Sequence, residues 1–181
     1  RDWQKFSGDI EIFREKKKVK FIGTSVYSPE EALIFAKNDY IDIIQVPVNI
    51  LDNRLLHNGF FEIAAHRKKK VFIRSVFLQG LLLMSDTELV EKDMGWASEY
   101  LVYYRSFLMK HNLIPQYFAL KAIKQKFPES VIITGVEHQT QLLENLKLLR
   151  SPDIDSSIID EWWSKLPEMP ERLLNPTKWV I

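Results

Sequence analysis

The sequence contains no cysteine among its 181 residues. This absence excludes a disulfide scaffold, a cysteine nucleophile and any metal site built from thiolates. An excess of charge of one sign is lacking as well, because 25 Lys and Arg stand against 24 Asp and Glu. A net charge of +1 provides no general attraction to nucleic acid or to an anionic membrane, so we expect neither as a partner.

Long apolar segments are also missing from the chain. No run approaches the roughly 20 apolar residues that span a bilayer. The segment Arg1–Lys20 is charged throughout and lacks the apolar core of a signal peptide, so we expect a cytoplasmic protein. The sequence opens with Arg1 rather than Met, which predicts a fragment or a processed product.

Several common motifs of catalysis and binding do not occur. There is no glycine-rich phosphate loop, no histidine pair at metal-ligand spacing and no paired carboxylates at a suggestive distance. The four histidines fall on or beside predicted helices, where we expect surface or helix-terminal positions: His57, His66, His111 and His138. The basic run from His66 to Lys70 is expected to be the solvated end of a helix.

The main architectural signal is the alternation of strand-like and helix-like segments. The strand-like segments are short, rich in β-branched residues and apolar at nearly every position, which is typical of parallel strands buried on both faces. They are Val19–Thr24, Ile41–Val46, Val71–Ser75 and Val131–Thr134. Helices are predicted from Ser28 (an N-cap before Pro29) and over His57–Lys70, Glu88–Lys110, Ile114–Phe127, Thr140–Arg150 and Ile154–Lys165.

This alternation predicts the α/β class, with parallel βα units in either a doubly wound layer or a barrel. We expect residues 1–150 to carry the βα units. Residues 151–181, rich in proline and containing Trp162 and Trp163, are expected to form a helix and an irregular strap packed on them. The two tryptophans could instead reach a binding pocket.

In both architectures the functional residues lie at the carboxyl ends of the strands. Small residues and side-chain amides such as Ser25, Gln45 and Asn49 gather there in this chain, and they suit hydrogen bonding rather than acid–base chemistry. The segment from Gly135 to Asn145 runs from a strand end into a helix N-terminus. It predicts either an anion site or a plain connection in which Thr140 caps the helix.

Four of these segments resemble, in order, strands five to eight of the aldo/keto reductases. They are KVKFIGTSVYSPEEA, IDIIQVPVNILD, VFIRSVFLQGLLL and VIITGVEHQTQLLENL. The segment NPTKW near the carboxyl end is similar to the closing motif of several bacterial members of the family. The resemblance implies half of a TIM-type (β/α)8 barrel whose complete form binds NADP or NAD and reduces an aldehyde, ketone or sugar carbonyl.

The resemblance also implies which residues bind the cofactor. Ser25 and Gln45 would hold the nicotinamide carboxamide, and Arg74 would stack on the nicotinamide ring. The loop after the third strand would cover the pyrophosphate, and the segment after the fourth would hold the adenosine end, with Glu144 and Asn145 near the adenine. The full set is Ser25, Gln45, Arg74, Ser75, Phe77, Gln79, Gly80, Gly135, Gln141, Glu144 and Asn145.

The chain departs from the family pattern in two respects. Gln141 and Gly135 replace positively charged residues that are usual in NADP-preferring members, so NAD is also a candidate cofactor. The catalytic Asp, Tyr, Lys and His of the family come from its first half, and none has a matching motif here. The sequence therefore provides no catalytic residue.

A half-barrel has a structural requirement of its own. The complete fold takes about 250 residues, and four of its strands alone leave two unpaired edges and an open apolar face. We therefore expect the missing amino-terminal half-barrel or a second copy of the chain as a partner.

Three functional hypotheses follow. The first is the cofactor-binding half of an NAD(P)-dependent aldo/keto reductase that is an enzyme only as a complete chain, with a small-molecule carbonyl substrate. The second is a non-catalytic half-barrel or degenerate reductase that binds a nucleotide or a protein partner. The third is a flavodoxin-like domain unrelated to reductases. In the first hypothesis Met84–Trp96 and Tyr100 form an apolar lining of the substrate pocket.

Overall fold

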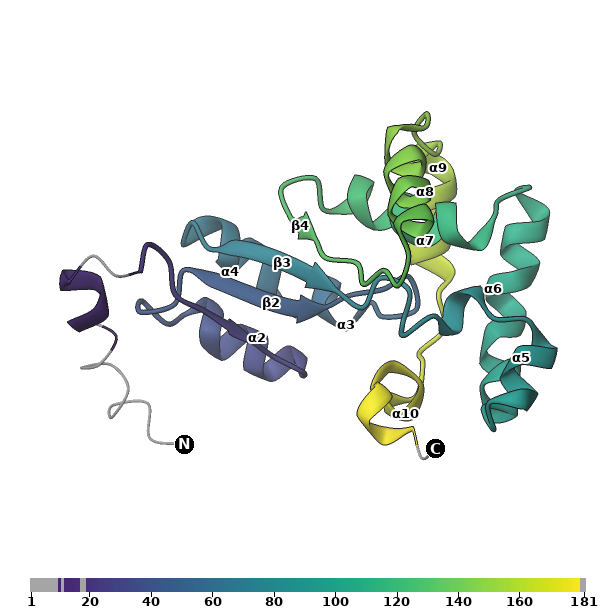
Figure 1. The fold of residues 1–181 in the computed structure, drawn as a ribbon, viewed down its shortest axis with the longest axis horizontal. Coiled ribbons are helices and arrows are strands. Elements are labelled where there is room, and N and C mark those ends of the chain that lie inside the picture. Colours follow the sequence, from purple (N-terminus) through teal and green to yellow (C-terminus); the bar gives the residue numbers. More distant parts are fainter. Residues whose placement is uncertain (1–9, 11, 17–18, 180–181) are drawn as a thin grey trace. The chain divides into compact units, whose positions relative to one another are not determined.

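A computed structural model of the chain describes residues 10, 12–16 and 19–179. These residues form an α/β protein with a four-stranded parallel sheet in the order β1-β2-β3-β4 (Figure 1). Each strand overlaps a segment that the sequence predicts, which confirms the α/β class and the parallel βα units. The strands are β1 (Gly23–Ser25), β2 (Ile43–Pro47), β3 (Lys70–Arg74) and β4 (Val131–Ile132).

The chain divides into two compact units. The first unit comprises residues within 1–47 and 54–73, and the second comprises residues 48–53 and those from 74 onward. The residues of the carboxyl-terminal tail therefore belong to the second unit. The predicted division at residue 150 stays a prediction.

In the first unit, helix α2 (Pro29–Ala36) begins where the sequence predicts it. Ser28 is its N-cap: the Glu31 backbone N–H donates to Ser28 Oγ, and the Glu31 carboxylate accepts from the Ser28 N–H. This reciprocal pair satisfies two donors that the helix leaves free. Ala32 and Ala36 are buried, and α2 packs against β2 and α4 (Phe60–His66).

The predicted helix over His57–Lys70 is wrong in its extent. The chain instead forms α3 (Arg54–His57) and then α4, separated by an Asn58-Gly59 turn. Gly59 has φ +79°, and Asn58 Oδ1 accepts a hydrogen bond from the Phe60 N–H at 3.0 Å. Asparagine and glycine favour this left-handed turn, which ends one helix before the next begins.

The basic run from His66 to Lys70 is predicted to be a solvated helix end, but two of its cations are bound to the chain. Lys69 Nζ donates to the backbone carbonyls of Asn38 and Ile41 at 2.6 Å each. Arg67 Nη1 donates to the Asp39 carboxylate at 2.8 Å. These two cations hold the loop between α2 and β2 against the end of α4, so their role is structural.

Burial along the strands also differs from the expectation of two covered faces. In β2 and β3 the buried positions alternate: Ile44 and Val46 in one strand, Val71 and Ile73 in the other. The positions between them are half-buried or exposed. One face of these strands is therefore closely packed and the other is covered incompletely.

Gly23 allows β1 and β2 to approach closely, and this gives a test of the packing in the first unit. A Cβ at Gly23 would lie 2.9 Å from the Ile43 carbonyl oxygen, closer than side chains tolerate. We expect Gly23→Ala to lower the free energy of unfolding by about 1–3 kcal/mol, measured by urea denaturation of the full-length protein. Gly135→Ala is the control, because no atom lies within 4 Å of its added Cβ. An equal loss in both variants would contradict this packing.

The second unit is mostly helical. Three predicted helices are confirmed within two residues at each end, as α7 (Pro115–Lys126), α8 (Gln139–Arg150) and α9 (Ser156–Lys165). The predicted helix over Glu88–Lys110 is interrupted, because Asp93 has φ +56° and ends the first of its pieces. The other elements are η1 (Leu81–Leu83), α5 (Asp86–Glu91), η2 (Gly95–Ala97), α6 (Ser98–Lys110), α10 (Glu171–Leu174) and η3 (Pro176–Lys178).

Trp162 of α9 lies at the centre of the core of the second unit and is fully buried. Its indole Nε1–H donates to the Ile50 carbonyl oxygen at 2.7 Å. Four aromatic rings of α6 and α7 surround it with centroids 4.9–5.8 Å away: Tyr103, Tyr104, Phe107 and Phe118. Trp162 therefore packs in the core and does not reach a binding pocket, which was the alternative. The tail that carries it completes the core.

Candidate functional site

Two of the predicted site residues meet in the first unit, at the ends of neighbouring strands. Ser25 of β1 stands opposite Gln45 of β2 in the parallel register. Gln45 Nε2 donates to Ser25 Oγ at 3.3 Å; Gln45 is half-buried and Ser25 exposed. The pair offers a hydroxyl and a carboxamide side by side, which are groups able to bind another amide.

Five more predicted residues lie at and after the end of β3, in the second unit. They are Arg74, Ser75, Phe77, Gln79 and Gly80, and they occupy one tight loop rather than scattered positions. Arg74 Nη1 donates to Ser75 Oγ at 3.1 Å.

The backbone of this loop is left-handed at four of its six positions. Ser75, Leu78 and Gln79 have φ values of +63°, +48° and +55°, and Gly80 has +85°. Non-glycine residues rarely adopt this conformation, which costs about 1 kcal/mol or more at each position. The loop is therefore held in shape by its surroundings, and Leu78 at its centre is fully buried.

Hydrogen bonds within the loop from Ser75 to Gly80 use only some of its backbone N–H groups. The Leu78 N–H donates to the Ser75 carbonyl at 2.8 Å, and the Gly80 N–H donates to the Phe77 carbonyl at 2.9 Å. Among the described residues, the N–H groups of Val76, Phe77 and Gln79 have no hydrogen-bond acceptor. A loop with several free N–H groups can bind an anion.

The remaining predicted residues lie at the start of α8 and on its first turns. His138 is the N-cap, and it makes no side-chain cap hydrogen bond. The expectation that Thr140 caps the helix is wrong, because Thr140 lies inside its first turn. Gln141 Oε1 accepts from the Glu137 N–H at 2.8 Å and so fixes the connection that enters the helix.

Gly135, Glu144 and Asn145 differ in their surroundings. A Cβ at Gly135 would meet no atom within 4 Å, so the space beside this residue is open. Glu144 is exposed, whereas Asn145 is only 5% exposed and its Oδ1 accepts from Gln116 Nε2 of α7 at 2.9 Å. Asn145 is thus the predicted residue that the fold holds most firmly.

The segment expected to line a substrate pocket is largely occupied by structural contacts. Ser85 and Glu88 form a capping box at the start of α5. The Arg172 guanidinium of α10 lies over the Trp96 ring, 4.2 Å from its centroid, a favourable cation–π contact. The tail therefore contacts the Trp96 ring, which is predicted to line the pocket.

The four histidines lie at helix termini, as predicted. His57 and His66 end α3 and α4, His111 follows α6, and His138 precedes α8. Asp42, an acid near a strand end, binds the Arg14 guanidinium at 2.7 Å and the Ile22 N–H at 2.9 Å. Its role is therefore structural. The described part of the chain holds no cluster of three or more histidines and carboxylates suited to a metal ion.

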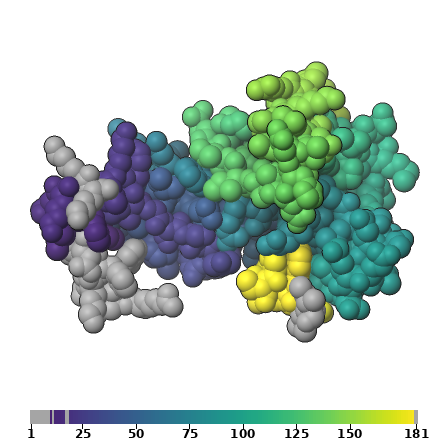
Figure 2. All heavy atoms as spheres, in the orientation of Figure 1, coloured from purple at the N-terminus to yellow at the C-terminus, as the bar shows by residue number. Residues whose placement is uncertain are grey.

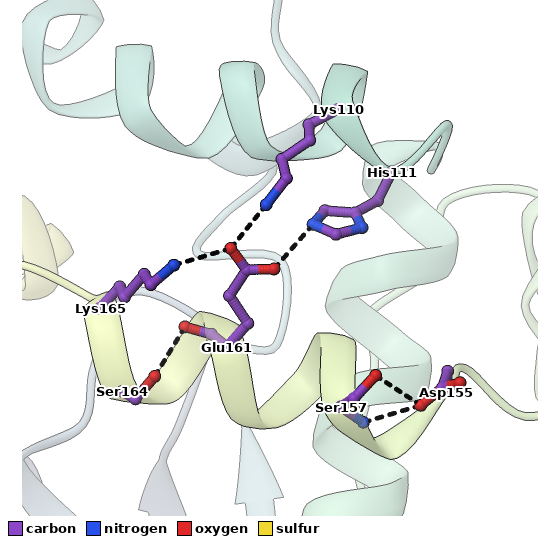
Figure 3. A network of polar contacts seen from close by, with 7 residues as sticks. All are labelled: Lys110, His111, Asp155, Ser157, Glu161, Ser164 and Lys165. Carbon is purple, nitrogen blue, oxygen red and sulfur yellow. Dashed lines mark hydrogen bonds and ion pairs between the residues drawn. The ribbon is translucent and has the colours of Figure 1, made fainter.

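A cluster of charged side chains joins α6 to α9 (Figure 3). The Glu161 carboxylate accepts from Lys110 Nζ at 2.6 Å and from Lys165 Nζ at 3.0 Å. His111 Nε2 lies 3.1 Å from the other carboxylate oxygen, at ion-pair distance but without hydrogen-bond geometry. The hydrogen bonds from Lys110 and then Lys165 lower the pKa of Glu161 from 4.5 to about 2.

This depressed pKa predicts how stability depends on pH. Because the folded-state pKa lies below the ordinary value of 4.5, the ionised Glu161 stabilises the folded chain above pH 4.5. That contribution is lost as the pH falls toward 2. We expect Glu161→Gln to flatten the fall of the thermal midpoint across this window. Asp160→Asn, an exposed neighbour on the same helix, should leave the slope unchanged, and an equal effect of both would contradict the assignment.

Sequence reasoning missed two features of these residues. The left-handed backbone at Ser75, Leu78 and Gln79 has no signal in the sequence, because serine, leucine and glutamine do not favour such angles intrinsically. The partner of Asn145 was also missed. Gln116 lies 29 residues earlier and follows Pro115 at the start of a predicted helix, which gives no indication of the contact.

No protein-family model matches this sequence, and no curated protein matches it. In the described part of the chain, every helix is too short or too polar to cross a membrane.

Proposed function

We propose that the chain is the cofactor-binding part of an NAD(P)-dependent aldo/keto reductase, which reduces a small-molecule carbonyl by hydride transfer in its complete form. The observation that carries the proposal is the loop from Ser75 to Gly80. Its left-handed backbone and the free N–H groups of Phe77 and Gln79, residues that are half-buried and exposed, suit the close approach of an anionic group such as a pyrophosphate. A dinucleotide contains such a group.

The start of α8 provides a second region suited to a nucleotide. Its first N–H groups lack a side-chain cap, and residues 135–140 are all exposed. A helix N-terminus favours negative charge. The positive charges usual at Gly135 and Gln141 are absent, so NAD is proposed beside NADP. The nicotinamide role of Ser25 and Gln45 stays a prediction from the resemblance.

We further propose that the strands belong to a (β/α)8 barrel. The sheet order follows the chain order without a reversal, whereas doubly wound sheets change direction at a switch point. In the first unit α2 packs against α4, as expected for helices on the same side of their strands. This arrangement supports the barrel over the flavodoxin-like alternative.

An apolar surface on α8 supports the proposal of a further barrel segment or a second copy as partner. Leu142, Leu143 and Leu146 are 43%, 57% and 38% exposed. In Figure 2 the surface of α8, in light green, is uncovered on the face in view. If a complete barrel covers these leucines, they are expected to be exposed to solvent in this chain alone.

Enzyme turnover tests the proposed function against its alternative, a degenerate reductase that binds a nucleotide without catalysis. The test uses the proposed complete form, in which an amino-terminal half-barrel supplies the catalytic Asp, Tyr, Lys and His. It is mixed with NADPH or NADH and a panel of aldehydes, ketones and sugars, and the loss of reduced cofactor is followed. We expect oxidation that depends on the carbonyl compound. Binding of the cofactor without carbonyl-dependent oxidation would favour the degenerate reductase, and the absence of both would overturn the two hypotheses together.

A further inference from the structure

The side-chain amide of Asn145 is held in one orientation. Asn145 is nearly buried between α8 and α7, and its Oδ1 accepts a hydrogen bond from Gln116 Nε2 at 2.9 Å. An amide carries its oxygen on one side and its NH2 group on the other. Because the Asn145 oxygen faces Gln116, the Asn145 NH2 group faces away from the Gln116 side chain.

The NH2 group of Asn145 keeps a hydrogen-bond donor that the described residues do not use. Within the part of the chain that the structure describes, Asn145 Nδ2 has no hydrogen-bond partner, and it is not among the unpartnered atoms sealed from solvent. A nearly buried polar group with a free donor is uncommon, since most such groups find a partner. The NH2 group of Asn145 is therefore a donor on α8 without a hydrogen-bond acceptor among the described residues.

We propose that Gln116 is a positioning residue, which fixes Asn145 so that the site presents a hydrogen-bond donor to the bound nucleotide. This inference rests on the proposed function and on the resemblance to aldo/keto reductases, which implies that Asn145 lies near the adenine. An NH2 group donates to a ring nitrogen of adenine and cannot accept from its exocyclic amino group. Gln116 thus sets which face of the base the site can recognise.

Replacing Gln116 is expected to change the Asn145 amide without moving α8. A second α7 residue, Lys121, holds the far end of α8, since its Nζ donates to the carbonyls of Leu149 and Ser151 at 3.0 and 2.8 Å. Lys121 also pairs with Asp153 at 2.8 Å. With this end fixed, replacing Gln116 frees or turns the Asn145 amide without releasing the helix.

Two variants of Gln116 separate positioning from stability. In Gln116→Glu the carboxylate only accepts hydrogen bonds, so the Asn145 NH2 group turns inward and the oxygen outward. In Gln116→Met no hydrogen bond remains, and the amide can turn either way. ADP is titrated calorimetrically into the full-length protein. We expect an affinity loss of about tenfold for Gln116→Glu and about threefold for Gln116→Met.

Gln125→Met is the matched control on the same helix. Gln125 bonds the Ile154 backbone through both ends of its amide, at 2.9 Å each, away from Asn145. This variant should bind ADP within about twofold of the wild type. If the wild type binds ADP and Gln116→Glu binds it equally well, the positioning role is overturned alone. If the wild type does not bind ADP, the proposed function is overturned and the positioning role with it.

Discussion

Replacing Trp162 with alanine is expected to lower the free energy of unfolding by about 3–5 kcal/mol, or to prevent folding of the second unit. The side chain is fully buried among four aromatic rings, so its removal leaves a large cavity that rigid neighbours fill poorly. The Ile50 carbonyl also loses its donor. Urea denaturation of the full-length protein, followed by circular dichroism, measures the change.

Trp162→Phe separates the two contributions. It retains an aromatic ring but not the indole N–H, so we expect a smaller loss, about 1–3 kcal/mol, from the unpaired carbonyl and the smaller ring together. Trp96→Ala is the control for removing a tryptophan, because Trp96 is only partly buried and contacts Arg172 from one side. A loss at Trp96 as large as that at Trp162 would contradict the assignment of Trp162 to the centre of the core.

The second large effect is expected at Gln79, in the proposed pyrophosphate loop. Its side chain is exposed, so a charge placed there leaves the packing intact while changing the potential around the free N–H groups. We expect Gln79→Glu to weaken NADPH binding about tenfold and Gln79→Lys to strengthen it a few-fold. Both effects should shrink as salt is added, because exposed charges are screened.

Asn112→Asp provides a matched control for this charge change. Asn112 is exposed and left-handed with φ +51°, like Gln79 with +55°, and it lies after α6. The substitution adds the same charge at a similar backbone position, yet it should leave NADPH affinity within about twofold. If the two Gln79 variants bind NADPH alike, the loop does not contact the phosphates of the cofactor.

Local signals in the sequence predicted the elements that depend on nearby residues. The start of α2 follows from Ser28, Pro29 and Glu31, whose capping interactions span only a few positions. The four strands follow from β-branched apolar runs, and their parallel pairing follows from the helices between them. The sequence also contains a signal for the break between α3 and α4, namely the Asn58-Gly59 pair. The apolar helical pattern around this pair nevertheless led to the prediction of a single helix.

Features that depend on distant residues could not be predicted in this way. The left-handed loop after β3 exists because the surrounding fold holds Leu78 in the core. The orientation of Asn145 depends on Gln116, and the shielding of Trp96 depends on Arg172 of the tail. Such contacts are set by side-chain geometry across the fold rather than by spacing along the chain.

The most direct test of the proposed function is a calorimetric titration of the folded, full-length protein with NADPH and with NADH. The proposal predicts saturable binding of one dinucleotide per chain by at least one of the two cofactors. Absence of binding by either, in a preparation that unfolds cooperatively, would contradict it.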